Sequence, residues 1–335
     1  MTRRTRRTHA PASKAKVALA AIKGEKTLAE LAQPPKNPRN RPMEILPTFT
    51  LTDIETSGAR IRLRHAGKGP GLLLLHGNPL THVAWHKIAP SLTDRFHVVA
   101  ADLRGYGDSS APQEDPDSAN YSFRAMAQDQ VEVMRALGHD RFYVAGHDRG
   151  ARTTHRMCLD HPEKIIKAAI IDIVPTLDMW AAMDKDAAIS GWHWPFMAQP
   201  APFPETMLGS VDPDWFMRKK LLKLTADLNH IPPEIWAEYV RCFNEKTIKG
   251  SCADYRAAAT IDCDLDTADL HRKLATPLLI LWGANSSVGK RFKDPLAIWR
   301  QRAEDVRGEA LPSGHYVNEE APEQVLDWLL RFFTA

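Results

Sequence analysis

Cysteine is scarce in this chain and long apolar runs are missing. These two features exclude several classes of site and of protein. The 335 residues include four cysteines, which form no CxxC pair and no Cys/His spacing of a metal site. We therefore expect reduced thiols, a reducing compartment and a cytoplasmic location. No apolar run approaches the roughly 18 residues that a membrane-spanning helix needs, so we expect no membrane partner.

The chain also lacks a strong net charge, but its near neutrality hides two regions of opposite sign. Residues 1–42 hold eleven Lys or Arg and two Glu, a net charge of +9, whereas the remainder holds 33 basic and 39 acidic residues, a net charge of −6. Ser13 is the only serine in the basic tail, which disfavours a transit peptide because such peptides are serine-rich. Charge alone would allow a nucleic-acid-binding arm.

The tail has a recognisable pattern. The stretch that begins MTRRTRR and continues through SKAKVALAAIKGEKTLAELAQ resembles the start of the helix-turn-helix transposase subunit of bacterial insertion sequences. In that family a recognition helix follows, whereas here the pattern stops at Gln33 and a proline-rich linker follows. Such motifs read DNA through the second helix, so we expect no specific nucleic-acid partner. We interpret residues 1–42 as a disordered tail or fusion remnant, with Met43 as the original start.

From Phe49 onward, apolar runs alternate with helical patterns. Strands are predicted at 50–57, 60–66, 71–76, 96–101, 141–146, 165–174 and 277–283, and helices include 122–138, 149–161 and 320–333. This alternation predicts an α/β fold with a mostly parallel, helix-covered sheet. No strand signal appears at 176–255, which we interpret as a helical cap inserted between core segments 43–175 and 256–335. Open α/β sheets keep their sites at the carboxyl ends of their strands, here beneath the cap.

One pentapeptide carries most of the functional signal. Gly146-His147-Asp148-Arg149-Gly150 follows a predicted strand and opens a predicted helix. This is the G-x-S-x-G nucleophile elbow of the α/β-hydrolase fold with Asp in place of Ser. A carboxylate is already ionised and can attack a saturated carbon that bears a leaving group. Asp148 is therefore the predicted nucleophile, and its product is an ester on the enzyme.

Hydrolysis of that ester requires a general base and an oxyanion hole. The predicted base is His315, in a loop before the last helix, because the order nucleophile, acid, histidine is that of this fold. The acid that orients it is predicted to be Asp172, since a lone carboxylate among apolar residues at a strand end would be costly. The oxyanion hole is predicted to use the backbone N–H groups of Arg149 and Asn78.

Two arginines predict an anionic substrate. Arg149 and Arg152 lie three residues apart on the first helical turn and so share a face. Two guanidinium groups there could hold a carboxylate in bidentate fashion and would offset its repulsion from Asp148. The alternative is that one of them pairs with a neighbouring Asp or Glu.

Three further segments carry a resemblance to a known family. The run from Gly146 to Arg152, the DIVPT sequence that starts at Asp172, and the HWPFMAQP sequence that starts at His193 resemble fluoroacetate dehalogenase, over a region from about Phe49 to the C-terminus. The resemblance implies that the two arginines hold the substrate carboxylate. It also implies that His193, Trp194 and Tyr255 hold the departing halide.

Two departures from that family concern the pocket. Asn78 stands where the family usually has an aromatic residue, and Asn at this position resembles haloalkane dehalogenases, which carry Trp rather than Arg after the nucleophile. Residues 221–224 replace a cap segment in which some relatives have Trp. Both differences could widen the pocket or shift the preference from fluoride toward chloride or bromide.

The sequence therefore predicts hydrolytic dehalogenation of a short 2-haloacid, haloacetate or fluoroacetate, to the 2-hydroxy acid. The partner is a small-molecule haloacid, no cofactor or metal is implied, and a homodimer is a reasonable expectation. The main alternative is an epoxide hydrolase, in which Tyr239 and Tyr255 would protonate the epoxide oxygen. That alternative leaves the arginine pair and the His193-Trp194 pair without a role. A non-catalytic binding protein of the same fold is the alternative from another class.

Overall fold

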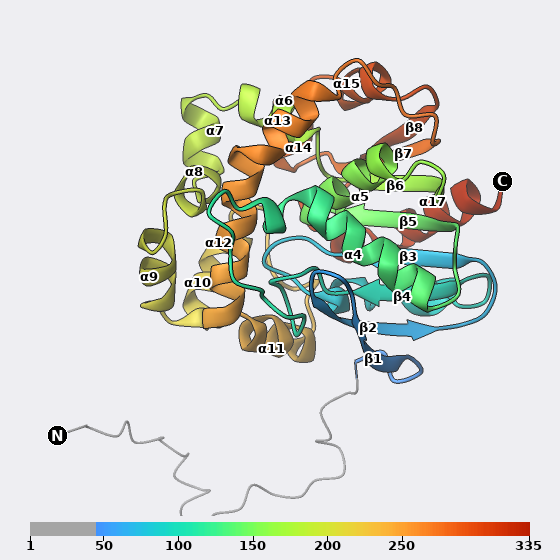
Figure 1. The fold of residues 1–335 in the computed structure, drawn as a ribbon, viewed down its shortest axis with the longest axis horizontal. Helices are drawn as coiled ribbons and strands as arrows, with labels where there is room; N and C mark the ends of the chain where they lie inside the picture. Colours follow the sequence, from blue (N-terminus) through green and yellow to red (C-terminus); the bar gives the residue numbers. More distant parts are fainter. Residues whose placement is uncertain (1–44) are drawn as a thin grey trace, which may run out of the picture. The chain divides into compact units, whose positions relative to one another are not determined.

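The computed structural model describes residues 45–335, whose fold is shown in Figure 1. The predictions for residues 1–42 and for Met43, including the resemblance to a transposase subunit, lie outside the described residues. Within the described part of the chain, no helix combines the length and apolar character that crossing a membrane requires.

An eight-stranded sheet forms the centre of the molecule, in the spatial order β1-β2-β4-β3-β5-β6-β7-β8. The first two strands pair antiparallel, and the strands from β4 across to β8 are parallel. The chain passes from β3 to β4 on one side and then to β5 on the other, so β3 and β5 flank a topological switch point, where such sheets bind ligands. The strands are β1 (Thr50–Glu55), β2 (Arg60–Ala66), β3 (Gly71–Leu75), β4 (His97–Ala101), β5 (Phe142–His147), β6 (Ile165–Ile171), β7 (Leu278–Gly283) and β8 (Val306–Leu311).

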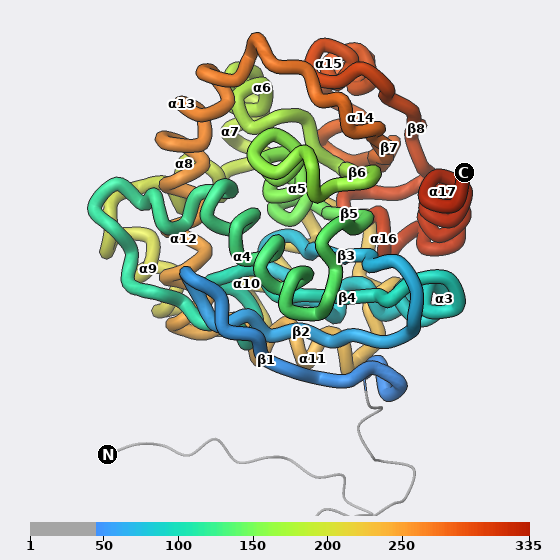
Figure 2. The backbone as a smooth tube through the Cα atoms, turned by 45° about the vertical axis from the view of Figure 1, so that its right-hand side comes forward, coloured from blue at the N-terminus to red at the C-terminus, as the bar shows by residue number. Residues whose placement is uncertain are grey.

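Helices cover both faces of this sheet, which explains why its central strands are apolar throughout. In β3, Leu73 and Leu75 pack in the cluster that includes α4 (Phe123–Ala136) and α5 (Arg149–Asp160). Leu72 and Leu74 pack in the opposite cluster with α3 (Ala89–Leu92) and α17 (Pro322–Thr334). Figure 2 shows α4 and α5 on one side of the strands and α3 and α17 on the other. The remaining core elements are η2 (His82–Trp85), η3 (Ala119–Tyr121), α13 (Ile261–Ala268), α14 (Ser287–Arg291), α15 (Pro295–Arg302) and α16 (Val317–Glu320).

The predicted set of strands lacked β8, which is a correction. Three of its six residues are exposed, two are partly buried, one of them Gly308, and only the last, Leu311, is buried. β8 is an edge strand that pairs only with β7 among the described strands. An edge strand needs no continuous apolar run, so the pattern that identified the buried strands could not find it.

A helical segment without strands follows β6, as the sequence indicates. It contains α6 (Thr176–Ala181), α7 (Lys185–Ser190), α8 (His193–Met197), α9 (Phe203–Gly209), α10 (Pro213–Leu221), α11 (Pro233–Cys242) and α12 (Glu245–Ala259). Most of these helices lie together at the left of Figure 1. Their apolar residues form a third cluster that also includes Leu80 and Tyr316, so this cap packs on loops that follow the sheet strands. The predicted cap boundary at residue 255 falls inside α12.

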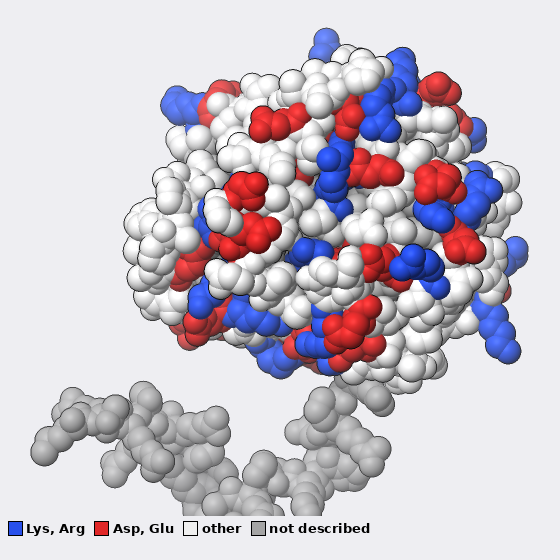
Figure 3. Space-filling model, viewed as in Figure 1, with Lys and Arg blue, Asp and Glu red and all other residues white. Residues whose placement is uncertain are grey.

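The surface of the described region mixes both signs of charge. On the face shown in Figure 3, Lys and Arg side chains are interspersed with Asp and Glu. Ion pairs of the described region include Arg124 with Asp160 and Arg241 with Asp108. The acidic balance of this region therefore does not produce a surface of one sign on this face.

Candidate active site

A sharp turn between β5 and α5 presents Asp148. Its φ is +48°, a left-handed value that a non-glycine residue adopts only when the surroundings enforce it. Close packing leaves no room for side chains around the turn: a Cβ on Gly150 would lie 2.6 Å from the carbonyl oxygen of His76, and one on Gly77 would lie 2.5 Å from the Cβ of Asp148. This geometry is that of a nucleophile elbow.

His315 and Asp172 meet although 143 residues separate them. Because a carboxylate only accepts, the Nδ1–H of His315 donates to Asp172 Oδ2 at 2.6 Å. The other oxygen of Asp172 accepts from the N–H of Gly283 at 2.9 Å and from the hydroxyl of Ser286 at 2.6 Å. The buried carboxylate is thus fully engaged, and it fixes the imidazole with Nε2 directed away from it.

That nitrogen faces the elbow. His315 Nε2 lies 4.0 Å from Asp148 Oδ2, a separation that leaves the two groups unbonded but adjacent. The backbone N–H of Asn78 donates to the same Asp148 oxygen at 3.0 Å. Arg149 is the first residue of α5, where backbone N–H groups have no intrahelical partner. Both predicted oxyanion-hole residues therefore adjoin Asp148, Arg149 as its neighbour in the chain and Asn78 through the N–H contact with its carboxylate.

The charges around Asp148 hold it ionised. Burial opposes ionisation, but the positive charges of His315, His147, Arg149 and Arg152 outweigh it and lower the pKa of Asp148 below its ordinary value of 3.8. For His315, burial lowers the pKa, but the hydrogen bond and charge of Asp172 outweigh it, and the net shift is upward from 6.5. An ionised carboxylate beside a histidine whose pKa is raised above its ordinary value is an arrangement suited to acid–base chemistry.

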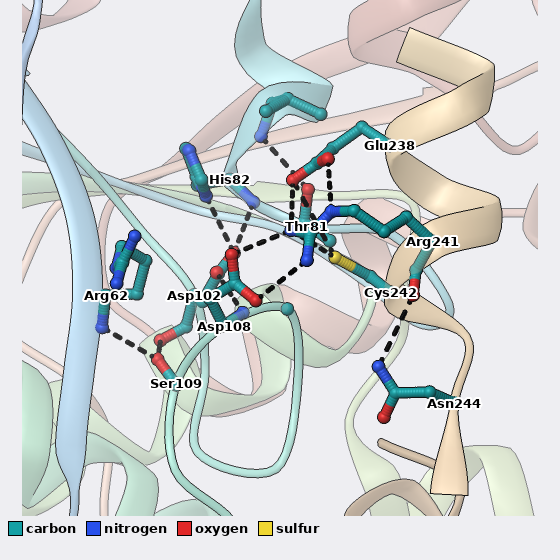
Figure 4. Close-up of polar contacts among 12 residues, drawn as sticks. Arg62, Thr81, His82, Asp102, Asp108, Ser109, Glu238, Arg241, Cys242 and Asn244 are labelled. Atoms are coloured by element: carbon teal, nitrogen blue, oxygen red, sulfur yellow. Dashed lines mark hydrogen bonds and ion pairs between the residues drawn. The ribbon is translucent and has the colours of Figure 1, made fainter. Parts of the chain in front are cut away.

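The loop that carries Asn78 is held by a network after β4. Asp102 Oδ1 accepts from the backbone N–H of His82 at 2.7 Å and from its ring Nδ1 at 2.9 Å. The other oxygen of Asp102 accepts from the N–H of Asp108 at 2.9 Å. Figure 4 shows this cluster and, beside it, Arg241 of α11, which donates to the Asp108 carboxylate. The network thereby ties the cap to the loops beneath it.

The two predicted carboxylate-binding arginines are both buried but differ in their partners. Arg149 makes a bidentate ion pair with Asp254, with its Nε 2.7 Å from Oδ2, and its Nη1 has no hydrogen-bond partner among the described residues. Arg152 donates from Nη1 to the carbonyl of Val174 at 3.0 Å and keeps its Nε without a partner in the same region. Burial and the charge of Arg149 lower the pKa of Arg152 to about 10, so it remains a cation at neutral pH. One arginine is thus largely neutralised by an acid, which was the alternative left open by the sequence.

The three predicted halide-binding residues form one aromatic cluster. The ring of Tyr255 lies 5.7 Å from that of His193 and 5.5 Å from that of Trp194, both in edge-on contact. The guanidinium groups of Arg149 and Arg152 stack over the Trp194 ring at 5.4 Å and 4.7 Å. Residues from α5, α8 and α12 therefore converge, and the cluster borders the elbow from the cap side.

A cavity of about 60 Å³ connects these groups. A water molecule needs at least about 10–15 Å³ of such space, so the cavity fits a ligand of only a few heavy atoms. Its walls combine the elbow, two histidines, two arginines and the cap, and they include Asn78, Asp148, Arg152, Asp172, His193, Trp194, Arg291 and His315. Arg149 and Tyr255 stand behind this wall rather than in it.

Sequence reasoning missed two charged residues of the site. Asp254 sits next to the predicted Tyr255, and its position one residue earlier on the same helix was the available signal. Lys220 is buried in α10 and its ammonium contacts the side-chain oxygen of Asn78. No local pattern distinguishes it from the exposed Lys219 beside it. Among residues 45–335, no His, Cys, Asp and Glu side chains are grouped so as to hold a metal.

The fold is that of an α/β hydrolase. Its mostly parallel sheet has an elbow at the switch point, a His–Asp pair lies beside the elbow, and a helical cap covers the site. The chain belongs to the alpha/beta hydrolase family, whose model, described as alpha/beta hydrolase fold, matches residues 70–212.

Individual relatives narrow the comparison. A fluoroacetate dehalogenase from Burkholderia sp. is 44% identical over 270 residues, which cover 80% of this chain and 88% of the relative. A soluble epoxide hydrolase from Corynebacterium sp. is 33% identical over 83% of this chain and 94% of its own length. The crystal structure of an α/β hydrolase from Nostoc sp. has a TM-score of 0.82 at 50% identity and covers 85% of this chain and 98% of the other.

Proposed function

We propose that this hydrolase removes halide from a short 2-haloacid, with haloacetate as the substrate class. The observation that carries the proposal is an ionised Asp148 that faces His315 in a small cavity also lined by Arg152. A serine at the elbow would suit acyl transfer, whereas a carboxylate suits displacement at a saturated carbon. The 44% identity to a fluoroacetate dehalogenase supports the same chemistry.

The reaction has two steps. An oxygen of Asp148 attacks the carbon next to the substrate carboxylate, the carbon–halogen bond breaks, and the halide leaves with the bonding electron pair. His315, held by Asp172, then takes a proton from water, and the hydroxide attacks the ester carbonyl. The N–H groups of Asn78 and Arg149 would stabilise the negative oxygen that develops. Collapse breaks the bond to the substrate oxygen, which takes the proton of the new carboxyl group, so the 2-hydroxy acid leaves and Asp148 is again a carboxylate. The proton held by His315 then passes to water.

The substrate would lie between two groups of residues. Its carboxylate would bind Arg152, which lines the cavity, and the halogen would point to His193 and Trp194 in the cap. Arg149, the other predicted carboxylate ligand, pairs with Asp254 and would add its charge from outside the cavity lining. Fluoride is a poor leaving group, so N–H donors aimed at it are needed to stabilise the developing charge. The small cavity favours haloacetate over longer haloacids.

Trapping the ester tests this mechanism. With His315→Asn, incubation with chloroacetate or fluoroacetate should release one halide per active site and leave a carboxymethyl ester on the peptide that contains Asp148, visible by mass spectrometry. Asp148→Asn is the matched control and should show no adduct. Halide release without an adduct on this peptide would contradict the mechanism. In a second variant, Arg152→Met with His315 intact, unchanged turnover of haloacetate would contradict the haloacid assignment.

Epoxide hydrolysis is the second candidate, because a relative of that activity covers most of the chain. It would need two cap tyrosines aimed at the epoxide oxygen. The hydroxyl of Tyr239, however, donates to Glu319 at 3.0 Å, and Tyr239 is not part of the cavity wall. Hydrolysis of a simple epoxide faster than dehalogenation of haloacetate would favour this candidate.

A cytoplasmic location and a homodimer stay predictions.

A further inference from the structure

Lys220 is a buried cation that the mechanism above does not use. It lies on α10 with 3% of its surface exposed. Its one hydrogen-bond partner among the described residues is the side-chain oxygen of Asn78, a neutral group. An ammonium has three N–H donors, and a buried charge without an anionic partner is costly. Such an arrangement is typical of a site that receives an anion.

Lys220 contacts Asn78, which lines the cavity, and its charge interacts with further charged and titratable groups of the site. They are Asp148 and Arg149 at the elbow, Cys252 on α12 and His193 on α8. After burial, the charge of Lys220 is the largest influence on the pKa of His193 and lowers it. The charge of Lys220 therefore acts on the residue proposed to hold the halogen.

A count of charges shows why a further cation matters. Asp254 neutralises much of the charge of Arg149, which leaves Arg152 as the one cation in the cavity wall without a carboxylate partner among the described residues. The site must accommodate the anionic Asp148 and an anionic substrate, and it then holds a free halide. A second uncompensated positive charge at the halogen end offsets this excess of negative charge.

We propose that Lys220 is a positioning residue that, together with Asn78, sets the affinity of the site for the departing halide. The proposal rests on the proposed function, since it assigns a role within the same reaction. The ammonium orients the Asn78 amide, and its charge favours a halide beside His193 in the low-dielectric interior. No proton moves in this step: the halide leaves carbon with the electron pair, and Lys220 remains protonated.

The charge of Lys220 depends on pH within an accessible range. Burial, the dominant cause, lowers the pKa of Lys220 to about 7, although the charge of Asp148 opposes the shift. A lysine is charged below its pKa, so halide affinity should be highest below pH 7 and fall as the pH rises through it. The pKa of His315 is raised above its ordinary value, so its charge also depends on pH, and only a comparison of variants isolates the contribution of Lys220.

Bromide binding measured by calorimetry from pH 6.0 to 8.5 tests the proposal without relying on turnover. Lys220→Met should weaken bromide binding about tenfold at pH 6.0, the value expected for loss of one charge-assisted interaction. The difference from wild type should vanish at pH 8.5. Lys220→Arg should keep tight binding at pH 8.5, because arginine does not titrate there. Lys219→Met, on the exposed neighbour, is the matched control and should change nothing. Thermal melts verify that each variant is folded.

The second measurement is the affinity for acetate, an analogue of the substrate carboxylate. Its affinity should change less than threefold in Lys220→Met, because its carboxylate binds at the arginine end. Equal bromide affinity in wild type and Lys220→Met at pH 6.0 would overturn the proposal, as would a loss confined to acetate. If the proposed function alone were wrong, haloacetate would not be turned over, but the bromide results would still stand.

Discussion

Replacing Asp172 with Asn should separate the two chemical steps. The carboxylate accepts three hydrogen bonds, from the N–H of Gly283, the hydroxyl of Ser286 and Nδ1 of His315. Asn keeps one oxygen for the first two but presents an NH₂ group to the imidazole. The ring must then accept at Nδ1 and carry its proton on Nε2, the nitrogen that has to act as the base.

The expected loss is large and confined to ester hydrolysis. The corresponding change in a serine protease lowers kcat about 10⁴-fold because it stabilises the wrong tautomer, and general-base catalysis alone is typically about 10²–10⁴-fold. Displacement by Asp148 needs no base, since its carboxylate is already ionised. Asp172→Asn should therefore form the ester at nearly the wild-type rate and hydrolyse it at least about 10²-fold more slowly.

Rapid-mixing measurements of halide release check this result. The variant should show a burst of one halide per active site, followed by a slow steady state, and the ester on Asp148 should accumulate. Ser287→Ala, at a cavity residue not bonded to Asp172, is the control and should show normal turnover. Steady-state turnover within tenfold of wild type, or a burst that disappears together with turnover, would refute the role assigned to Asp172.

Three other measurements test separate parts of the structure. Asp254→Asn removes the carboxylate partner of the buried Arg149 and should lower the free energy of unfolding by about 3–5 kcal/mol. Asp327→Asn, in the exposed ion pair with Arg331, should change it by less than about 1 kcal/mol, and similar urea midpoints for the two variants would contradict the difference in burial. Ester hydrolysis requires neutral His315, so kcat should fall as the pH drops through the raised pKa of His315. The halide burst should persist over the same pH range. Loss of the burst at the same pH midpoint as kcat would argue against an ionised nucleophile. Gly150→Ala forces a Cβ against backbone and should cost about 1–3 kcal/mol, and Gly209→Ala, with open space around it, should cost less in the same thermal melts.

Local sequence was enough for the features that depend on neighbouring residues. A pentapeptide was enough to predict the elbow around Asp148, because a tight turn between a buried strand and a helix needs glycines at fixed positions. The buried strands are apolar on both faces, and this pattern predicted all of them, whereas the exposed edge strand β8 has no such pattern and was missed. The absence of strands at 176–255 also follows from composition, because that stretch is rich in Trp, Met and Pro.

Only the tertiary structure decided how distant charges pair. Arg149 and Asp254 are 105 residues apart in the chain, and whether an arginine meets an acid or keeps its charge free depends on how the cap packs over the core. The same holds for Lys220, which contacts Asn78 across 142 residues, while its neighbour Lys219 is exposed. Sequence fixes the types of reactive group and their local geometry, but burial and the pairing of charges arise from the fold as a whole, since both depend on which surfaces the cap brings together.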